Sequence, residues 1–389
     1  MCVMKTINVF SSGDANDPAT WSNIPYCLVR QLEKRGFRCN CFDVSLASFG
    51  KIIYWISCVW YSIMRRVHEF LHPGTQFLYT FERTPFFCWL VEKRISRLLT
   101  SHADAILNIV FSFSFLAKSS NIPCMLFCDW SYEFLIRYRH GRMPFFLERG
   151  FIAHERRVMK AADYVVSLFE EAAEAQMELQ NDIKVQYYNK NVVNNLNDKE
   201  LMPANAAIAL KKSSHRLLFI GRKHYINAAK QLVRVAFELT KRYDDFVVDI
   251  IGLNYSDFDD VLPKCICCHG FLNKGDEAQR RLYYDLLERA TCFVNSSPEW
   301  GGYSSTIETM YYYTPIVIAP YKQFQLEFGN YIDFGVYVEN QSDEALLYAV
   351  EKVMRCPDYE KCAFSSHVAV RDYSWENFSR WLLEKVVKL

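Results

Sequence analysis

The residues best suited to chemistry lie between Thr291 and Pro320, where an apolar stretch runs into acids, glycines and hydroxyl side chains. Glycine lets a backbone approach a ligand closely, and free N–H groups at a helix start attract phosphate. Glu308, one turn inside the expected helix, can accept hydrogen bonds from ribose hydroxyls. These features together suit a nucleotide-sugar, whose expected contacts are Gly301, Gly302, Tyr303, Ser304 and Ser305.

Glu308 also has a purely structural interpretation. Ser305-x-x-Glu308 matches a capping box, in which the glutamate reaches back to the start of its own helix. A cap does not explain why Glu299 and two glycines come before it. Both interpretations stay open on the motif alone.

The elements around this segment must hold it at the edge of a sheet. Residues 292–295 and 316–319 read as strands, and residues 303–313 have helical spacing. Similar alternation along the chain predicts two sets of strands, at 5–10, 38–44, 76–80, 105–110, 123–128, 164–167 and 185–188, and at 216–220, 246–251, 265–269, 292–295, 316–319 and 335–338. Strands alternating with helices imply α/β domains with parallel sheets covered on both faces.

The fold class expected is therefore α/β, with two Rossmann-like doubly wound domains. Residues 1–200 would form the first domain, 201–372 the second, and 373–389 a final helix, with polar residues 191–214 as the linker. Open sheets of this kind bind ligands beyond the carboxyl ends of their strands. Candidate ligand residues should then lie in the loops that follow strands.

Composition restricts the partners. The 389 residues include 45 basic and 44 acidic side chains, which argues against a nucleic-acid binder acting through global charge. Fourteen cysteines without a recognisable signal peptide predict reduced thiols and a cytoplasmic location. Cys265–His269 looks metal-like but lacks a second pair at zinc-site spacing, so a strand is the better interpretation and no metal is expected.

Two segments raise the question of a membrane surface. Ile52–Met64 is apolar but too short to span a bilayer. We expect it to be buried, and the alternative is a helix lying at a bilayer surface with Arg65 and Arg66 at the headgroups. The basic, aromatic run 137–146 could meet lipid phosphates or a polyprenyl-linked acceptor, or be a solvated loop. A peripheral position at the inner face of a membrane is thus the second possibility for location.

Four segments, found in order at 219–239, 246–252, 269–276 and 286–319, resemble the C-terminal half of a family 4 glycosyltransferase. Residues 103–135 and 154–174 resemble its N-terminal domain more loosely, and 372–386 resembles its tail helix. The resemblance implies the GT-B fold, with two domains facing across a cleft and a C-terminal helix crossing back. It also implies transfer of a sugar from a UDP- or GDP-sugar with retention of configuration, and without a metal or other cofactor.

In that family two acids separated by seven residues serve the donor. Glu308 matches the second acid, which binds the ribose. Glu299 matches the first, which faces the sugar, only if the loop bulges by one residue, because eight residues separate it from Glu308. Trp300 occupies the strict position and has no carboxylate.

The resemblance also places cations and glycines around the diphosphate and base. Gly221 and Arg222 match the family's arginine, whose fork donates to two oxygens at once. The family's lysine position falls near Asn227 or Ala228, so Lys223 or Lys230 would substitute, or the site would use one cation. Gly270 and Phe271 match the loop that receives the base.

The acceptor side has weaker signals. Gly13 follows the first strand, where the family has an acceptor-facing glycine loop, and Asp129 ends a buried strand near the expected reacting centre. We expect Arg222 and amides at 302–305 to stabilise the leaving diphosphate. With Glu299 and Asp129, Arg222 completes the expected catalytic set.

These observations predict a retaining hexosyltransferase acting on a glycan or lipid-linked glycan, in polysaccharide or glycoconjugate biosynthesis. Two alternatives remain. One is an epimerase-like or phosphorylase-like enzyme of the same architecture, and the other is a sugar-nucleotide-binding module without activity, suggested by the shifted Glu299 and the missing lysine.

Overall fold

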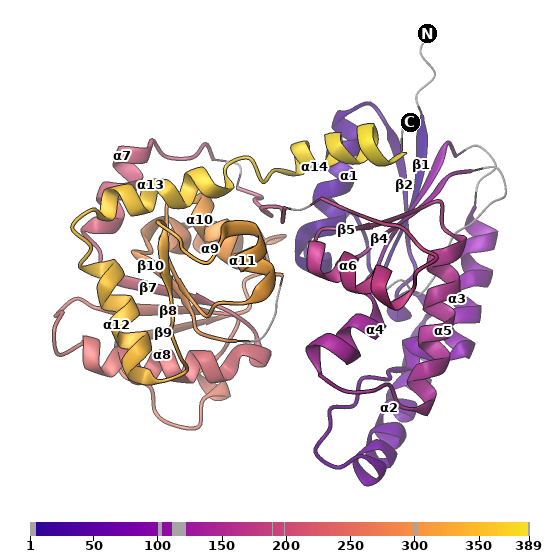
Figure 1. Ribbon diagram of the computed structural model, residues 1–389, viewed down its shortest axis with the longest axis horizontal. Coiled ribbons are helices and arrows are strands. Elements are labelled where there is room, and N and C mark those ends of the chain that lie inside the picture. The colour runs from indigo at the N-terminus through magenta and orange to yellow at the C-terminus, as the bar shows by residue number, and fades with distance from the viewer. Residues whose placement is uncertain are drawn as a thin grey trace. The chain divides into compact units, whose positions relative to one another are not determined.

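The chain folds into two compact units. The computed structural model describes residues 5–99, 103–110, 122–188, 190–197, 199–298 and 302–387. The first unit runs to Lys190 and also includes the segment that begins at Trp375, and the second runs from Asn191 to Ser374 (Figure 1). Each unit is built around its own six-stranded parallel sheet.

The first sheet has the order β2-β1-β3-β4-β5-β6. Its strands are β1 (Thr6–Ser11), β2 (Arg38–Asp43), β3 (Ala105–Ile109), β4 (Cys124–Phe127), β5 (Tyr164–Ser167) and β6 (Val185–Tyr187). The central strands β3 and β4 are buried at every position, because helices cover both faces of a parallel sheet.

The helices of this unit are α1 (Ile24–Lys34), α2 (Lys51–Leu71), α3 (Pro85–Leu98), α4 (Tyr132–Phe134), α5 (Phe146–Ala161), α6 (Glu170–Leu179) and α14 (Trp375–Trp381). Helices α3 and α5 pack on one face, where Phe87, Val91 and Val158 join the core of the sheet. Thr84 caps α3 by accepting from the Phe87 N–H, just before a proline at the first helical position.

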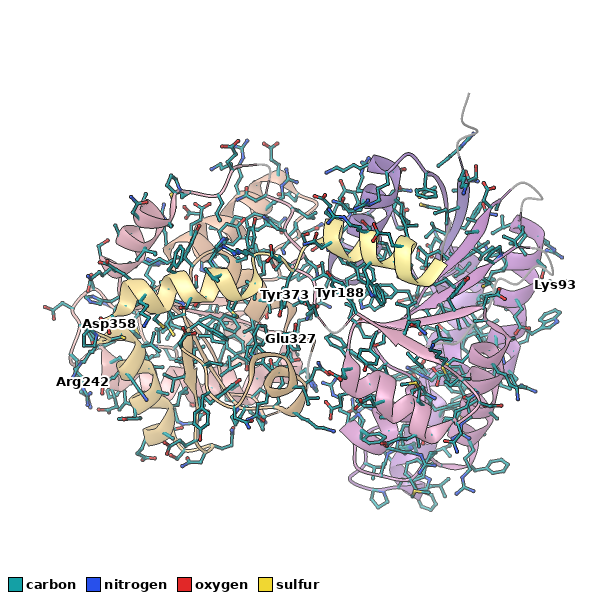
Figure 2. The ribbon with its side chains drawn as sticks, turned by 45° about the horizontal axis from the view of Figure 1, so that its top comes forward. Lys93, Tyr188, Arg242, Glu327, Asp358 and Tyr373 are labelled. Atoms are coloured by element: carbon teal, nitrogen blue, oxygen red, sulfur yellow. The ribbon has the colours of Figure 1, made fainter. Side chains whose placement is uncertain are left out.

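The tail helix α14 belongs to the first unit, as the sequence predicts. Phe378 is fully buried and its ring lies 5.4 Å from Phe127 of β4 and 5.2 Å from Tyr188 (Figure 2). The Arg35 side chain, at the end of α1, donates to Ser379 Oγ and to the Glu376 carbonyl, both at 2.9 Å. Aromatic burial therefore holds the end of the chain on a domain whose other residues all precede Asn191.

The second sheet has the order β12-β11-β10-β7-β8-β9. Its strands are β7 (Arg216–Ile220), β8 (Val247–Ile251), β9 (Ile266–Gly270), β10 (Cys292–Asn295), β11 (Ile316–Ile318) and β12 (Gly335–Tyr337). Its helices are α7 (Ala204–Lys212), α8 (Ile226–Leu239), α9 (Glu277–Arg289), α10 (Ser304–Tyr311), α11 (Lys322–Phe328), α12 (Asp343–Met354) and α13 (Tyr359–Val370). Helices α8 and α12 pack together on one face, and α7, α9, α10 and α13 form the other layer.

Most expected strands and helices are present within a few residues, and both sheets are parallel as predicted. Residues 76–80 are not a strand. The segment expected to be a linker contains α7, whose Lys211 is buried and donates to the carbonyls of Leu287 and Ala290 and to Thr314 Oγ1. Because these acceptors satisfy its ammonium group, a polar-looking stretch packs as part of the second unit.

The prediction that Ile52–Met64 is buried is wrong. Helix α2 turns only one narrow side toward the unit, and Ile52 and Trp55 on its other side are 77% and 67% exposed. The sequence could not separate the two sides, because apolar residues occur on both. Across the residues that the structure describes, every helix is too short or too polar to cross a bilayer.

Thirteen cysteines lie in the described ranges, and all are free thiols. The run 265–269 enters strand β9, as expected. His269 Nε2 lies 2.8 Å from Asp249, which Arg216 also contacts at 2.8 Å, so this histidine has a hydrogen-bonding partner on the neighbouring strand.

Candidate functional site

The candidate site lies where the second sheet changes direction. The chain passes from β7 outward through β8 to β9, then returns to place β10 on the other side of β7. The loops after β7 and β10 therefore leave the sheet in opposite directions, which opens a crevice at their carboxyl ends. Gly221 and Arg222 follow β7, and the segment leading to Tyr303 follows β10.

Three glycines allow the loops on this edge to approach closely. A Cβ atom on Gly252 would lie 2.5 Å from the Gly221 carbonyl oxygen, and Gly252 has a φ of +97°. The Gly252 N–H donates to the Gly270 carbonyl at 2.7 Å, so the loop after β8 is fastened to the end of β9. The glycines thus bring main-chain atoms close together at the carboxyl edge of the second sheet.

The structure brings Arg222 and Phe271 together. The Arg222 guanidinium lies 4.9 Å from the centre of the Phe271 ring, and both side chains are exposed. They come from the loops after β7 and β9, which the sequence assigned separately to the diphosphate and the base. A guanidinium group that lies on an aromatic face can still donate its N–H groups to an anion.

The two lysines considered as substitutes both face carboxylates. Lys223 Nζ lies 2.9 Å from Asp257, and Lys230 at the start of α8 pairs with Asp259. In the ranges that the structure describes, Arg222 makes no ion pair. Of these three side chains, it has the charge most available to an incoming phosphate.

Helix α10 begins with an uncapped first turn. Tyr303 is its N-cap, with a left-handed φ of +35° and no side-chain cap. The first intrahelical bond runs from the Ile307 N–H to the Tyr303 carbonyl, so the N–H groups of Ser304 and Ser305 precede the helical ladder. The Tyr303 hydroxyl donates to Glu327 of α11, which helps to fix this turn.

Glu308 does not cap α10, so the capping-box interpretation is wrong. Its buried carboxylate accepts from Lys274 Nζ at 2.6 and 2.8 Å, from the Tyr283 hydroxyl at 2.9 Å and from the Tyr284 hydroxyl at 3.3 Å. Burial, followed by the nearby Glu308 charge, raises the pKa of both tyrosines well above its usual value. The carboxylate is thus held by hydrogen bonds from α9 and from the loop after β9.

The sequence analysis missed Lys274, Tyr283 and Tyr284. Lys274 is 34 positions from Glu308, and its ammonium group also lies 4.2 Å from the Tyr283 ring centre. The signal available was a lysine in the loop expected to receive the base, within the segment 269–276. Glu299, Trp300 and Gly301 lie outside the described residues, so the one-residue shift of Glu299 is not addressed by the structure.

In the first unit, Gly13 lies at the corresponding change of direction. It follows β1, whose neighbours in the sheet are β2 and β3. Gly13 has a φ of +115°, its N–H donates to Asp43 Oδ1 at 3.0 Å, and a Cβ would lie 2.8 Å from Thr20 Cγ2. This tight turn requires glycine and exposes backbone at the carboxyl edge of the first sheet.

Asp129 lies two residues after the end of β4 and is buried, with 7% of its surface exposed. Its Oδ1 atom has no hydrogen-bond partner within the described part of the chain, and burial raises the pKa of the carboxyl group to about 7. Ser167 holds the Asp129 backbone by donating to its carbonyl oxygen at 2.8 Å. The carboxyl group is therefore a polar group at a sheet edge with unused hydrogen-bonding capacity.

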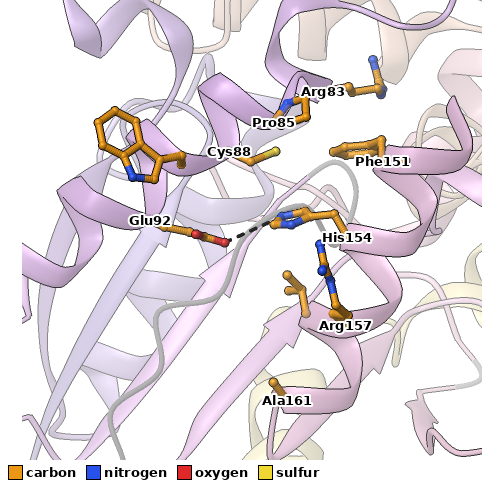
Figure 3. Close-up of a pocket in the computed structure, with 11 residues that line it drawn as sticks. Arg83, Pro85, Cys88, Glu92, Phe151, His154, Arg157 and Ala161 are labelled. Carbon is orange, nitrogen blue, oxygen red and sulfur yellow. Dashed lines mark ion pairs between the residues drawn. The ribbon is translucent and has the colours of Figure 1, made fainter. Parts of the chain in front are cut away.

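A separate groove of about 510 Å³ lies between α3 and α5 (Figure 3). Its lining includes Trp89, Glu92, His154 and Arg157, and His154 Nε2 lies 3.9 Å from Glu92. None of the residues predicted to be functional lines it.

No protein-family model matches the chain, and no curated protein matches it. Several solved structures are similar to the chain. A TarM variant from S. aureus, in complex with fondaparinux, α-GlcNAc-glycerol and UDP, has 15% sequence identity and a TM-score of 0.54, over 76% of this chain and 57% of TarM. The chain therefore spans little more than half of that protein.

Two further structures match over nearly the whole length. Sucrose-phosphate synthase from Thermosynechococcus elongatus has 13% identity and a TM-score of 0.63, covering 99% of this chain and 98% of that one. Trehalose 6-phosphate synthase from Burkholderia multivorans has 10% identity and a TM-score of 0.62, covering 99% and 97%. At such identities the similarity establishes the fold, and this chain has the two-domain α/β fold called GT-B.

Proposed function

We propose that this chain is a retaining glycosyltransferase of the family 4 type, which moves a sugar from a UDP- or GDP-sugar to a glycan or lipid-linked glycan. One observation carries the proposal. Arg222 on Phe271 and the uncapped first turn of α10 lie on loops from β7, β9 and β10, at the place where the second sheet changes direction. Anionic nucleotides suit this combination of a cation, an aromatic ring and free amides.

In the proposed reaction the diphosphate leaves as negative charge develops on it. Arg222 would donate two N–H groups to its oxygens, and the amides of Ser304 and Ser305 would add fixed dipoles. Both are in place before the reaction, so little reorganisation is needed. The acceptor hydroxyl would attack from the same face, with phosphate oxygen receiving its proton.

The proposed ribose ligand is Glu308. Its carboxylate accepts hydrogen bonds from the Lys274 ammonium group and from the hydroxyl groups of Tyr283 and Tyr284. Ribose hydroxyls would compete with the tyrosines and leave the lysine contact in place. On the acceptor side, the backbone at Gly13 would contact the acceptor, and the Asp129 carboxyl group would bind one of its sugar hydroxyls.

A binding module without activity is the second candidate. The observation favouring it is that the Glu308 carboxylate already has three protein donors, which leaves it few positions for a ligand. A panel of nucleotide-sugars would separate the two candidates by measuring both binding and donor hydrolysis. Tight binding without turnover of any donor or acceptor would favour the module.

The Arg222→Gln variant tests the site itself. We expect UDP affinity to fall about tenfold or more, because a charge-assisted contact to phosphate is lost. The matched control is Arg234→Gln on α8, an exposed arginine that pairs with Asp343 at 2.7 Å. Titration calorimetry measures both, and an equal affinity of Arg222→Gln and wild type would refute the proposed phosphate contact.

A further inference from the structure

Helix α2 carries two stripes on adjacent faces, an inner one that packs on the first unit and an outer one that is apolar, with centres about 120° apart. The inner stripe, formed by Ile53, Ser57, Trp60, Met64 and His68, faces the first unit and is buried or half-buried. The outer stripe is exposed and consists of Ile52, Trp55, Ile56, Val59, Ile63, Val67 and Phe70. Spacings of three and four residues place these seven side chains along one face for the length of the helix. A solvated helix would be expected to carry polar residues there.

The inner stripe fixes the orientation of the helix. The Trp60 ring lies 5.8 Å from the ring of Tyr79 and 5.9 Å from that of Phe81, and 6.2 Å from that of Phe77. His68 is buried and its Nε2 lies 2.9 Å from Thr75 Oγ1. Turning the outer stripe inward would break these contacts, so its exposure is a property of the folded unit.

Further apolar side chains are exposed near the end of α2. The His72 ring stacks on Phe145 at 3.7 Å, which brings the start of α5 against the end of α2. Beside it, Phe146 is 85% exposed, and Met143 and Leu147 are also exposed. We call the outer stripe together with Met143, Phe146 and Leu147 the α2 surface.

The segments that form the α2 surface are strongly basic. Residues 51–72 and 137–147 contain six basic residues, Lys51, Arg65, Arg66, Arg137, Arg139 and Arg142, and one acidic residue, Glu69. Three of these arginines are paired within the unit, Arg65 with Glu69, Arg137 with Glu133 and Arg142 with Glu148. The rest of the chain has the opposite balance, since 45 basic and 44 acidic residues leave 39 against 43. Lys51 and Arg66 are exposed and make no ion pair within the described residues, so they place positive charge beside the exposed apolar side chains of α2.

We propose that the α2 surface inserts into the headgroup region of a membrane that contains anionic lipids, with α2 lying parallel to the bilayer. Apolar side chains would enter the acyl boundary, Trp55 would lie at the interface where tryptophan is favoured, and Lys51 and Arg66 would contact lipid phosphates. A second copy of the chain fits less well, because self-pairing of this face would bring like charges together. The proposal goes beyond the proposed function, since it holds whether or not the chain transfers a sugar.

Co-sedimentation of the full chain with vesicles tests this proposal. One set of vesicles contains phosphatidylcholine with phosphatidylglycerol, and the other contains phosphatidylcholine alone. We expect binding to the anionic vesicles that weakens with added salt. The variant Trp55→Gln/Phe70→Gln should lower the partition coefficient at least about tenfold, because two large interfacial side chains are lost.

The matched control is Phe237→Gln/Phe364→Gln, which removes two exposed aromatic side chains from the second unit, 56% and 49% exposed. Both variants should keep the wild-type unfolding midpoint, since all four positions are exposed. Equal vesicle binding by Trp55→Gln/Phe70→Gln and the control would overturn the proposal. So would a wild-type dimer in solution that this variant dissociates, with binding to neither kind of vesicle.

Discussion

Lys274 and Glu308 form a buried ion pair, and its contribution to stability can be separated from its proposed role in ligand binding. Replacing Glu308 alone leaves the Lys274 ammonium, only 10% exposed, without its carboxylate. Breaking a buried pair in this way costs about 3–5 kcal/mol, whereas replacing both members by apolar groups is often close to neutral. Loss of stability in a single variant would therefore say little about ligand binding.

We predict that Glu308→Ala lowers the free energy of unfolding by about 3–5 kcal/mol and that Lys274→Met/Glu308→Ala recovers most of it. UDP affinity should stay low in the double variant, because the proposed ribose ligand is absent. Urea unfolding and calorimetric titration give the two quantities. Wild-type UDP affinity in a stable double variant would show that Glu308 serves the fold alone.

The buried carboxyl group of Asp129 should make the stability of the protein depend on pH. Burial raises the pKa of its carboxyl group from 3.8 to about 7 in the folded protein. The folded state therefore retains a proton that the unfolded state loses above pH 3.8, so this group lowers stability progressively from about pH 4 to 7 and by a constant amount above that. The neutral variant Asp129→Asn has no such dependence.

We predict that the stability of Asp129→Asn relative to wild type increases by a few kcal/mol between pH 4 and 7 and then levels off. Thermal or urea unfolding across this range measures the difference. The control is Asp182→Asn, since Asp182 is exposed and Lys160 lowers the pKa of its carboxyl group. A flat difference for Asp129→Asn would mean that its carboxyl group is solvated or paired in solution.

At the scale of elements, local patterns were enough to predict the sheets and the loops of the site. Short apolar runs between helical spacings identified β7, β9 and β10, and the candidate ligand residues were predicted from the turn residues after each strand. Register and strand order were not available from these patterns. They depend on pairing between distant strands, such as β7 with β10.

Other features depended on tertiary contacts and could not be predicted. Helix α2 is apolar on both sides, so its sequence does not say which side packs. The sequence of helix α7 predicts a polar linker. Lys211 packs because it donates to carbonyl groups of distant residues, which a linear pattern does not reveal. Likewise, Glu308 has the spacing of a helix cap, yet its partners come from α9 and from the loop after β9.

At the scale of the whole molecule, the two units have separate sheets and cores. A change in one unit should therefore alter the stability of that unit and leave the other unchanged. The first unit depends on the C-terminal helix, where Phe378 is fully buried among Phe127, Tyr188 and Trp375. The second unit contains the proposed nucleotide site. A core substitution in α14 and an added nucleotide should therefore act on different parts of the chain.

We predict that Phe378→Ala destabilises the first unit by about 3–5 kcal/mol, the usual cost of removing a buried aromatic ring. UDP at about one hundred times its dissociation constant should stabilise the second unit by about 2.7 kcal/mol through mass action. Hydrogen exchange read by mass spectrometry assigns each effect to peptides. Faster exchange should appear in β1, β3 and β4 with the variant, and slower exchange in β7, β10 and the start of α10 with UDP. If either change spread equally over both units, they would unfold as one cooperative body, and the stability of the donor site would depend on the chain's last helix.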